Sequence, residues 1–152
     1  MEDPSDIRNW QRRPDGITTS GRLEPGDPAR LAALGVRHVV NLALADHPEA
    51  LPDEAAALAE QGIAYTHIPV PFDAPEQAHV AALASVLAKA EGPVHVHCIM
   101  NYRVTAFFYL LGIEAGVPEP EARARMAAIW DPLSGEDPQT AAWRALLAPA
   151  AP

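Results

Sequence analysis

The sequence predicts an α/β fold, a single domain with a mainly parallel central sheet flanked by helices. Short runs of β-branched or alternating apolar residues take turns with longer segments whose apolar residues recur at helical spacing. Strands separated in this way form βαβ units, because a parallel connection must cross back over the sheet. A chain of 152 residues suffices for one well-covered core and is too short for two ordinary domains. We therefore expect one domain over 1–152.

The first half of the chain contains two of the expected strand–helix pairs. ITTSGRL at 17–23 is short enough for an edge strand, and an Asp-Pro start with a closing glycine is typical of a helix at 27–35, with Asp27 as its N-cap. The β-branched run VRHVVNLAL at 36–44 is the clearest strand. A Pro-Asp-Glu start and a closing glycine predict the next helix at 52–62.

The second half continues the alternation. IAYTHIPV at 63–70 alternates as a strand, and the proline-bounded loop PFDAP follows it. Apolar residues at helical spacing predict a helix at 76–90, and PVHVH at 93–97 is the next strand. The segment at 103–115 is apolar nearly all round, which is typical of a buried helix. The remaining expected elements are a more polar helix at 118–130 and a short one at 138–147.

Composition and charge limit the partners that the protein can have. Eleven basic against twenty acidic side chains give a formal charge of −9, which repels nucleic acid and anionic lipid unless a basic pocket intervenes. No apolar run approaches the roughly 20 residues of a membrane span, and the acidic N-terminus is unlike a secretory signal. The single cysteine cannot form an intramolecular disulfide. We expect a cytoplasmic protein with a free thiol and neither a nucleic-acid nor a membrane partner.

The segment PVHVHCIMNYRVTAF, residues 93–107, carries the strongest chemical signal. Cys98 directly follows a predicted strand, and Arg103 opens the next predicted helix. Ligands of parallel sheets bind beyond the carboxyl ends of the strands, where free N–H groups at a helix start can bind an anion. These groups and the guanidinium stabilise a thiolate, and the arginine fork fits two oxygens of a phosphate. The pattern favours a cysteine nucleophile over the alternative, a buried structural thiol.

His97, Cys98 and Arg103 resemble the phosphate-binding loop of the cysteine-dependent protein tyrosine and dual-specificity phosphatases, in particular their small bacterial members. TSGRL, HVVNLAL, IAYTHIPV with its Asp-bearing loop, the alanine-rich helix and IWDP near Trp130 agree with this family. The resemblance covers most of residues 16–132, and it implies that this stretch is the core of a phosphatase-like fold.

The resemblance implies hydrolysis of phosphate monoesters through a phosphocysteine, with Cys98 as the nucleophile. Asp73, on the loop after a strand, would protonate the leaving oxygen and then activate water. The phosphoryl oxygens would be held by Arg103 and by the N–H groups of Ile99, Met100, Asn101 and Tyr102. Neither metal nor cofactor takes part in this chemistry, and the substrate would be a phosphorylated protein or a small phosphate ester.

The loop departs from the family pattern in its length. Four residues separate Cys98 from Arg103, whereas the family usually has one more, with a glycine in third place. Asn101 stands at the glycine position, and asparagine is the non-glycine residue that best tolerates a left-handed backbone. A lost N–H donor would lower the rate by about 10²- to 10³-fold if it met developing charge. The hydroxyl that commonly follows the arginine comes one place later, at Thr105.

Two other functions fit part of the pattern. Rhodanese-like sulfurtransferases also place a cysteine at a strand end, and they resemble this chain in having a loop one residue shorter than that of the phosphatases. They give no role to Asp73, and they leave the N-terminal likeness unexplained. A phosphatase-like protein could instead bind a phosphorylated or sulfated ligand without turning it over.

Several polar residues have more than one interpretation. Asp73 fits either a mobile acid or the N-cap of the helix that follows it. His97 is expected to orient the loop through a backbone hydrogen bond, and Asn41 to tie loops together beneath the site. His95 shares a face with His97 and could bind a metal with it, but a third ligand at a recognisable spacing is missing.

The aromatic residues near the site favour packing roles. Tyr102 would line the mouth of the pocket or cover the next helix. Trp130 and Trp143 are expected as packing anchors rather than as platforms for a ligand.

Overall fold

Five strands form one sheet in the order β1-β2-β5-β3-β4 in the computed structural model, which describes residues 2–152. β2, β5, β3 and β4 are parallel to one another, and β1 pairs antiparallel with β2 at the edge. The strands are β1 Gln11–Arg12, β2 Thr18–Ser20, β3 His38–Asn41, β4 Ala64–His67 and β5 Val94–His97. This sheet confirms the predicted α/β class.

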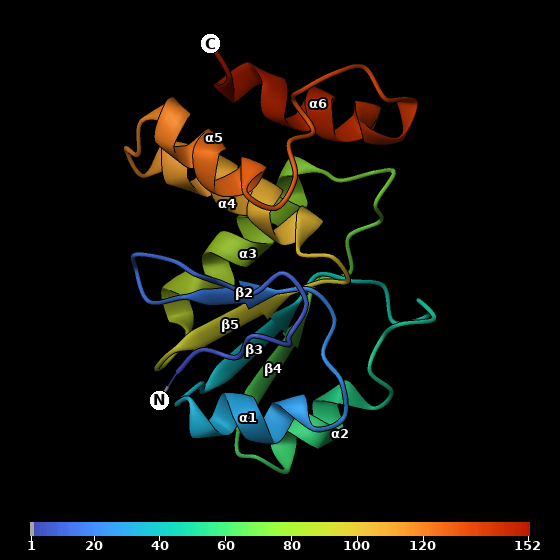
Figure 1. Cartoon of the computed structure of the whole chain (residues 1–152), viewed down its shortest axis with the longest axis vertical. Coiled ribbons are helices and arrows are strands. Elements are labelled where there is room, and N and C mark those ends of the chain that lie inside the picture. Colours follow the sequence, from blue (N-terminus) through green and yellow to red (C-terminus); the bar gives the residue numbers. More distant parts are fainter. Residues whose placement is uncertain (1) are drawn as a thin grey trace.

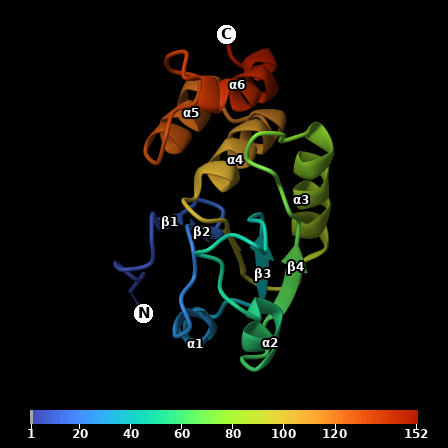
Figure 2. The same cartoon turned by 90° about the vertical axis from the view of Figure 1, so that its right-hand side faces the viewer.

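Helices cover both faces of the sheet (Figure 1). α1 and α2 lie on one face, and α3 and α4 lie on the other, with α5 and α6 packed outside them. Figure 2 shows the same layers from the side, with the sheet between the two groups. The helices are α1 Asp27–Ala33, α2 Glu54–Ala59, α3 Gln77–Lys89, α4 Tyr102–Glu114, α5 Glu119–Ala127 and α6 Ala141–Leu147, the last between 3₁₀ turns at Pro138–Thr140 and Ala148–Ala150.

Each face of the sheet has its own apolar core. Successive side chains of a strand point to opposite faces, so Val39 packs with the α1 and α2 side while Val40 packs with the α3 and α4 side. Both valines are fully buried, which stabilises the fold by about 1.5–3 kcal/mol each. The packed core begins at Ile7 and ends at Leu147, beyond both limits of the stretch that carries the family resemblance.

The structure differs from the sequence prediction mainly at element ends. β1 was not predicted, because two polar residues leave no periodic pattern. The helix expected at 138–147 is a 3₁₀ turn followed by α6. Asp27 is the first residue of α1 rather than its N-cap, and its carboxylate accepts a hydrogen bond from the N–H of Glu24 at 2.8 Å.

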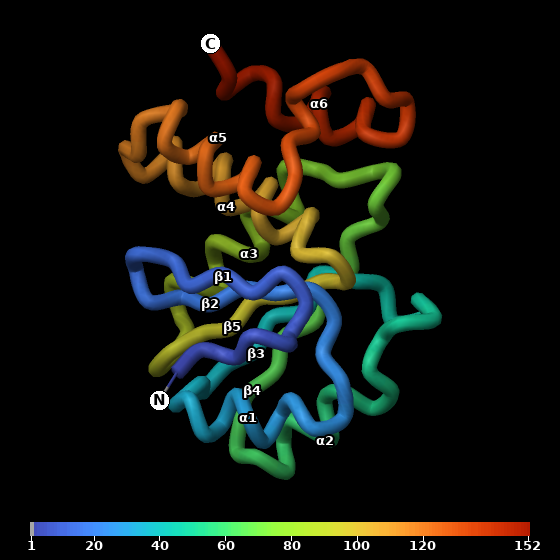
Figure 3. The backbone as a smooth tube through the Cα atoms, viewed as in Figure 1, coloured from blue at the N-terminus to red at the C-terminus, as the bar shows by residue number. Residues whose placement is uncertain are grey.

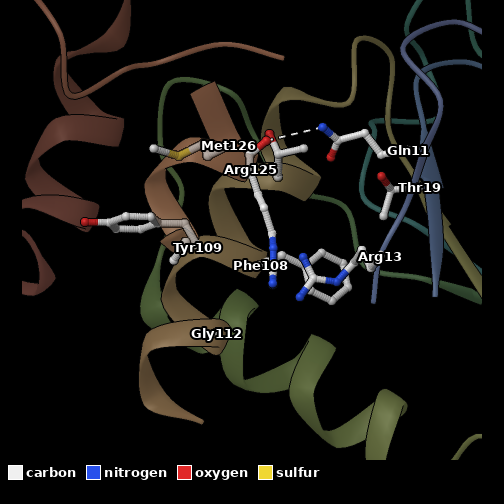
Figure 4. A pocket seen from close by; sticks show the side chains of 10 residues that line it. Gln11, Arg13, Thr19, Phe108, Tyr109, Gly112, Arg125 and Met126 are labelled. Carbon is white, nitrogen blue, oxygen red and sulfur yellow. Dashed lines mark hydrogen bonds between the residues drawn. The ribbon is translucent and has the colours of Figure 1, made fainter. Parts of the chain in front are cut away.

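The β1–β2 edge packs against α4 and α5 around a void of about 10 Å³ (Figure 4). The Gln11 amide donates to the carbonyl oxygen of Arg125 at 3.2 Å, and the Arg13 guanidinium lies 4.1 Å from the centre of the Phe108 ring. A void of this size holds one water molecule at most. This seam is therefore a packing contact and not a ligand site.

None of the helices in the described part of the chain, residues 2–152, is both long and apolar enough to span a bilayer.

Candidate active site

Cys98 lies at the carboxyl end of β5, inside a cavity of about 570 Å³. The cavity is formed mainly by the loop after β3, the loop after β4 and the β5–α4 loop with the start of α4, and Gln139 from the 3₁₀ turn before α6 completes it. Figure 3 shows the backbone paths that converge at this edge of the sheet. The cavity is lined by Leu44, Asp46, His47, Pro48, Phe72, Cys98, Ile99, Met100, Tyr102, Arg103 and Gln139.

The β5–α4 loop turns sharply at Asn101. This residue has φ = 68° and ψ = 7°, the left-handed conformation that the sequence predicted for it. Its carbonyl oxygen accepts hydrogen bonds from the N–H and the hydroxyl of Thr105, at 3.1 and 2.9 Å. The Thr105 hydroxyl is thus directed to the backbone at the helix start.

Arg103 lies in the first turn of α4 and is only 7% exposed. Its Nη1 donates to the carbonyl oxygen of Val70 at 2.8 Å, which ties the guanidinium to the loop after β4. The Nε of Arg103 is buried and has no hydrogen-bond partner among residues 2–152. A buried cationic donor without an acceptor is costly, and Arg103 is also one of the residues that line the cavity.

His97 joins the loop to α2 through a buried pair. Its Nδ1 donates to the carbonyl oxygen of Cys98 at 3.0 Å, the backbone contact expected from the sequence. Its Nε2 lies 2.6 Å from Oε2 of Glu54, and both residues are buried. Since a carbonyl can only accept, Nδ1 carries a hydrogen, and Nε2 is the nitrogen that faces the Glu54 carboxyl group. No local pattern predicted a site role for Glu54, which is 43 positions away from His97.

Asn41 fixes the chain where β3 ends. Its Oδ1 accepts the N–H of Ala43 at 2.8 Å, and its Nδ2 donates to the Tyr65 hydroxyl at 3.2 Å. The Glu54 carboxylate lies 3.5 Å from the same amide. Asn41 thus connects the loop after β3 with β4 and α2, beneath the cavity.

The buried His95 has both ring nitrogens hydrogen-bonded. Ser20 donates its hydroxyl to the Gly21 carbonyl oxygen, so it accepts from Nε2 of His95 at 2.8 Å. Nδ1 of His95 accepts from the Thr18 hydroxyl at 2.8 Å. Burial, and then the neighbouring His97, lower the pKa of His95 well below its ordinary value. The ring is a neutral part of the core with no nitrogen free for a metal.

Asp73 is exposed and does not line the cavity. It is not the N-cap of the following helix either, because α3 begins at Gln77 with Glu76 as its cap. The N–H of Glu76 donates to Nδ1 of His79 at 3.0 Å, and the Glu76 side chain accepts in return. The capping interpretation of Asp73 is therefore wrong. The carboxyl group on the cavity wall belongs to Asp46.

An aromatic cluster supports the cavity from the α4 side. The Tyr102 ring stacks on Trp130 with a centroid distance of 4.6 Å, and the Trp130 indole donates to the Tyr102 carbonyl oxygen at 2.9 Å. Trp143 is fully buried and donates to the carbonyl oxygen of Phe72 at 2.7 Å. Both tryptophans are packing residues, and Tyr102 lines the cavity, one of the two roles considered for it, while its ring packs on Trp130.

The chain matches a family model described as "Beta-lactamase hydrolase-like protein, phosphatase-like domain" over residues 11–115. The chain belongs to this family. The superfamily that His97, Cys98 and Arg103 indicated is thereby confirmed, and with it the phosphatase-like character of the domain. No curated protein sequence matches the chain.

Solved structures show the same fold. A DUF442 protein from Shewanella putrefaciens CN-32 is 31% identical, with a TM-score of 0.80 over 95% of this chain and 92% of that one. The nma1982 protein of Neisseria meningitidis Z2491 is 22% identical, with a TM-score of 0.68 over 78% and 86%. TpbA from P. aeruginosa is 23% identical, with a TM-score of 0.70 over 98% and 88%. The last two comparisons support the fold alone.

Proposed function

We propose that this protein hydrolyses phosphate monoesters through a phosphocysteine intermediate on Cys98. The observation that carries the proposal is that Cys98 and Arg103 line one cavity at the carboxyl end of the sheet, where the Arg103 guanidinium also has a buried Nε without a partner among residues 2–152. A thiol nucleophile and a guanidinium on the walls of one cavity fit an oxyanion that is attacked at its central atom. Membership of a phosphatase-like family supports the same chemistry.

The reaction has two steps, formation of the phosphocysteine and its hydrolysis. The Cys98 thiolate attacks phosphorus, the bond to the ester oxygen breaks, and that oxygen leaves as an alcohol after gaining a proton from an acid. Water then attacks the phosphocysteine and loses a proton to the same group, releasing inorganic phosphate and the thiolate. We assign the acid to Asp73, next to the cavity residue Phe72, with Asp46 as the competing candidate.

The loop supplies the remaining charge stabilisation. Among residues 2–152, the N–H groups of Ile99, Met100 and Asn101 have no protein acceptor, so they are available to the phosphoryl oxygens. Arg103 adds its two-pronged guanidinium. His97 orients the loop through the carbonyl of Cys98.

The walls of the cavity favour an aromatic phosphate ester, as in the tyrosine or dual-specificity type of phosphatase. Beyond the polar base, the lining is mainly apolar and includes Leu44, Pro48, Phe72, Met100 and Tyr102. Such walls bind a phenyl ring better than a polar alkyl group. Among the structural neighbours, a TpbA variant was solved in complex with pTyr.

Three assays separate this function from its alternatives. The protein should hydrolyse p-nitrophenyl phosphate, Cys98→Ser should lose turnover but still bind tungstate, and Arg103→Lys should lose several orders of magnitude in kcat. Retained turnover in Cys98→Ser would overturn the proposal. Thiocyanate formation from thiosulfate and cyanide would instead indicate a sulfurtransferase, and tungstate binding without any turnover would indicate a binding protein.

A further inference from the structure

The N-terminal segment Ile7–Trp10, here called the N-terminal arm, lies against the outer side of the β5–α4 loop. It comes from the far end of the chain, 91 positions before its contacts in the loop. The arm was not part of any sequence prediction. In Figure 3 it is the dark-blue stretch that precedes β1 and bends beside the strand ends.

Apolar contacts anchor the arm on both sides of its polar centre. Ile7 is 4% exposed and belongs to the core on the α1 and α2 side. The Trp10 ring stacks on the buried His95 with a centroid distance of 5.0 Å. Between these anchors, the carbonyl oxygen of Arg8 accepts the N–H of Gly21 at 2.7 Å. Arg8 and Asn9 are therefore held in place by the fold.

These two residues donate hydrogen bonds to consecutive carbonyls of the loop. Nη1 of Arg8 lies 3.3 Å from the carbonyl oxygen of Ile99, which also accepts the N–H of Arg22 at 2.9 Å. Nδ2 of Asn9 donates to the carbonyl oxygen of Met100 at 2.9 Å.

Asn9 and Asn101 form a reciprocal pair. The amide of Asn101 donates to the carbonyl oxygen of Asn9 at 2.7 Å, and Asn9 bonds the neighbouring carbonyl of the loop in return. Both asparagines have positive φ, 51° for Asn9 and 68° for Asn101. Each turn thus supports the other.

The direction of these bonds has a chemical consequence. A trans peptide group is planar, and its C=O and N–H point in opposite directions. Holding the carbonyls of Ile99 and Met100 toward the arm directs the N–H groups of Met100 and Asn101 toward the cavity. Neither N–H has an acceptor among residues 2–152, and Met100 lines the cavity, so both groups are available to an oxyanion bound there.

We infer that Arg8 and Asn9 are positioning residues that set the N–H groups of the shortened loop for oxyanion binding. The inference rests on the proposed function of the cavity. It gives the N-terminal arm the role of ordering the β5–α4 loop, which is one residue shorter than is usual in the family. Arg8 also pairs with Glu49 at 2.9 Å, in the connection after β3 that contributes Pro48 to the cavity.

The test compares the double variant Arg8→Gln/Asn9→Gly with the control Arg12→Ala. Glycine keeps the positive φ of Asn9 without strain, and Arg12 is an exposed neighbour that pairs with Asp3 away from the loop. Tungstate binding, kcat and KM for p-nitrophenyl phosphate, and amide hydrogen exchange of the loop peptide are measured well below the unfolding temperature. The double variant should bind tungstate about tenfold more weakly, lose about tenfold in kcat and exchange its loop amides faster, while the control should match the parent.

If the arm is merely structural, the double variant should have a lower unfolding temperature but the same tungstate affinity and loop exchange as the parent. That result would overturn the inference. If the double variant does not fold, Asn9→Asp decides the point, because it keeps the shape and replaces the donor with an acceptor facing the Met100 carbonyl. If the parent itself shows neither turnover nor tungstate binding, the proposed function fails. Loop exchange in the variants then still tests the arm, with unchanged exchange counting against it.

Discussion

The two sides of the cavity are built from different interactions. On one side, the loop after β3 is tied by Glu49 to Arg8 and Arg22, at 2.9 and 3.2 Å. The pKa of Glu49 lies below its ordinary value, chiefly because Arg8 donates to its carboxylate. On the other side, the loop after β4 is held through Phe72, whose ring packs against Trp130 and Trp143.

The polar contacts and the aromatic contacts constrain the β5–α4 loop in different ways: the first fix its orientation, and the second fix its position. Hydrogen bonds and ion pairs are directional, so the first side, here called the polar side, can fix which way each peptide group of the β5–α4 loop points. Packed aromatic rings are less directional, and they fix where the loop lies and exclude water from its back. Losses on the aromatic side should therefore appear mainly in stability, and losses on the polar side mainly in oxyanion binding and turnover.

The largest stability effect is expected at Trp143, which is fully buried among Phe72, Phe107 and Trp130. Trp143→Ala removes the ring and leaves a cavity, and it should lower the free energy of unfolding by about 3–5 kcal/mol in urea titrations. Trp143→Phe keeps most of the packing and loses the N–H to Phe72, so it should lose distinctly less. A decrease of less than about 1 kcal/mol in the free energy of unfolding of Trp143→Ala would show that the aromatic cluster contributes little to stability.

The next effect concerns the two candidate acids, Asp73 on the aromatic side of the cavity and Asp46 on the polar side. A general acid matters most for a poor leaving group, because that oxygen must gain a proton as its bond breaks. Asp73→Asn should lose about 10²-fold in kcat on phenyl phosphate and clearly less on p-nitrophenyl phosphate. Asp46→Asn serves as the matched control and should affect both substrates equally and weakly. The reverse result would move the acid role to Asp46, on the polar side.

The sequence predicted the parts of the fold that depend on local patterns. Two strands were predicted from their residues: the β-branched run around Val39 and Val40, and the alternating stretch before Cys98. Glycines predicted helix ends, as at Gly35 with φ = 92°. Each of these signals lies within a few residues of the element that it sets. β1 carried no such pattern, because it is defined only by its pairing with β2.

The candidate site could be predicted only where its residues are neighbours in the chain. Cys98, Arg103 and the positive φ of Asn101 follow from one short segment. Glu54 and Arg8 reach the same segment from 43 and 91 positions away, and such contacts depend on the topology of the sheet rather than on spacing. The same limit explains why the capping role considered for Asp73 was wrong, since Glu76 and His79 close that helix between themselves.

A smaller effect is expected at Gly21, where the polar side meets the loop. A Cβ atom at this position would clash with the carbonyl oxygen of Ile99 and lie 3.0 Å from Cδ of Arg8. Gly21→Ala should therefore displace that carbonyl, lower the free energy of unfolding by about 1–3 kcal/mol and weaken tungstate binding. Gly26→Ala is the control, because its Cβ meets nothing within 4 Å. Equal behaviour of the two variants would mean that the loop adapts freely.

The smallest effect concerns His95, which lies behind the polar side and carries the stacked Trp10. Its pKa is lowered by burial, so the ring should stay neutral in the folded protein while the unfolded chain titrates near the ordinary value of 6.5. Below that pH the unfolded state binds more protons, and the stability contributed by the neutral ring is lost as pH falls, by at most about 1.4 kcal/mol per pH unit. Above pH 6.5 the stability contributed by the neutral ring is complete.

NMR spectra of the ring should show unchanged His95 shifts from about pH 7.5 to 5.5 in the folded protein, and a full titration in urea. A folded-state midpoint near 6.5 would mean that His95 accepts a charge beside Trp10. The anchor of the N-terminal arm would then weaken in mild acid, and the polar side would lose the rigidity that distinguishes it from the aromatic one.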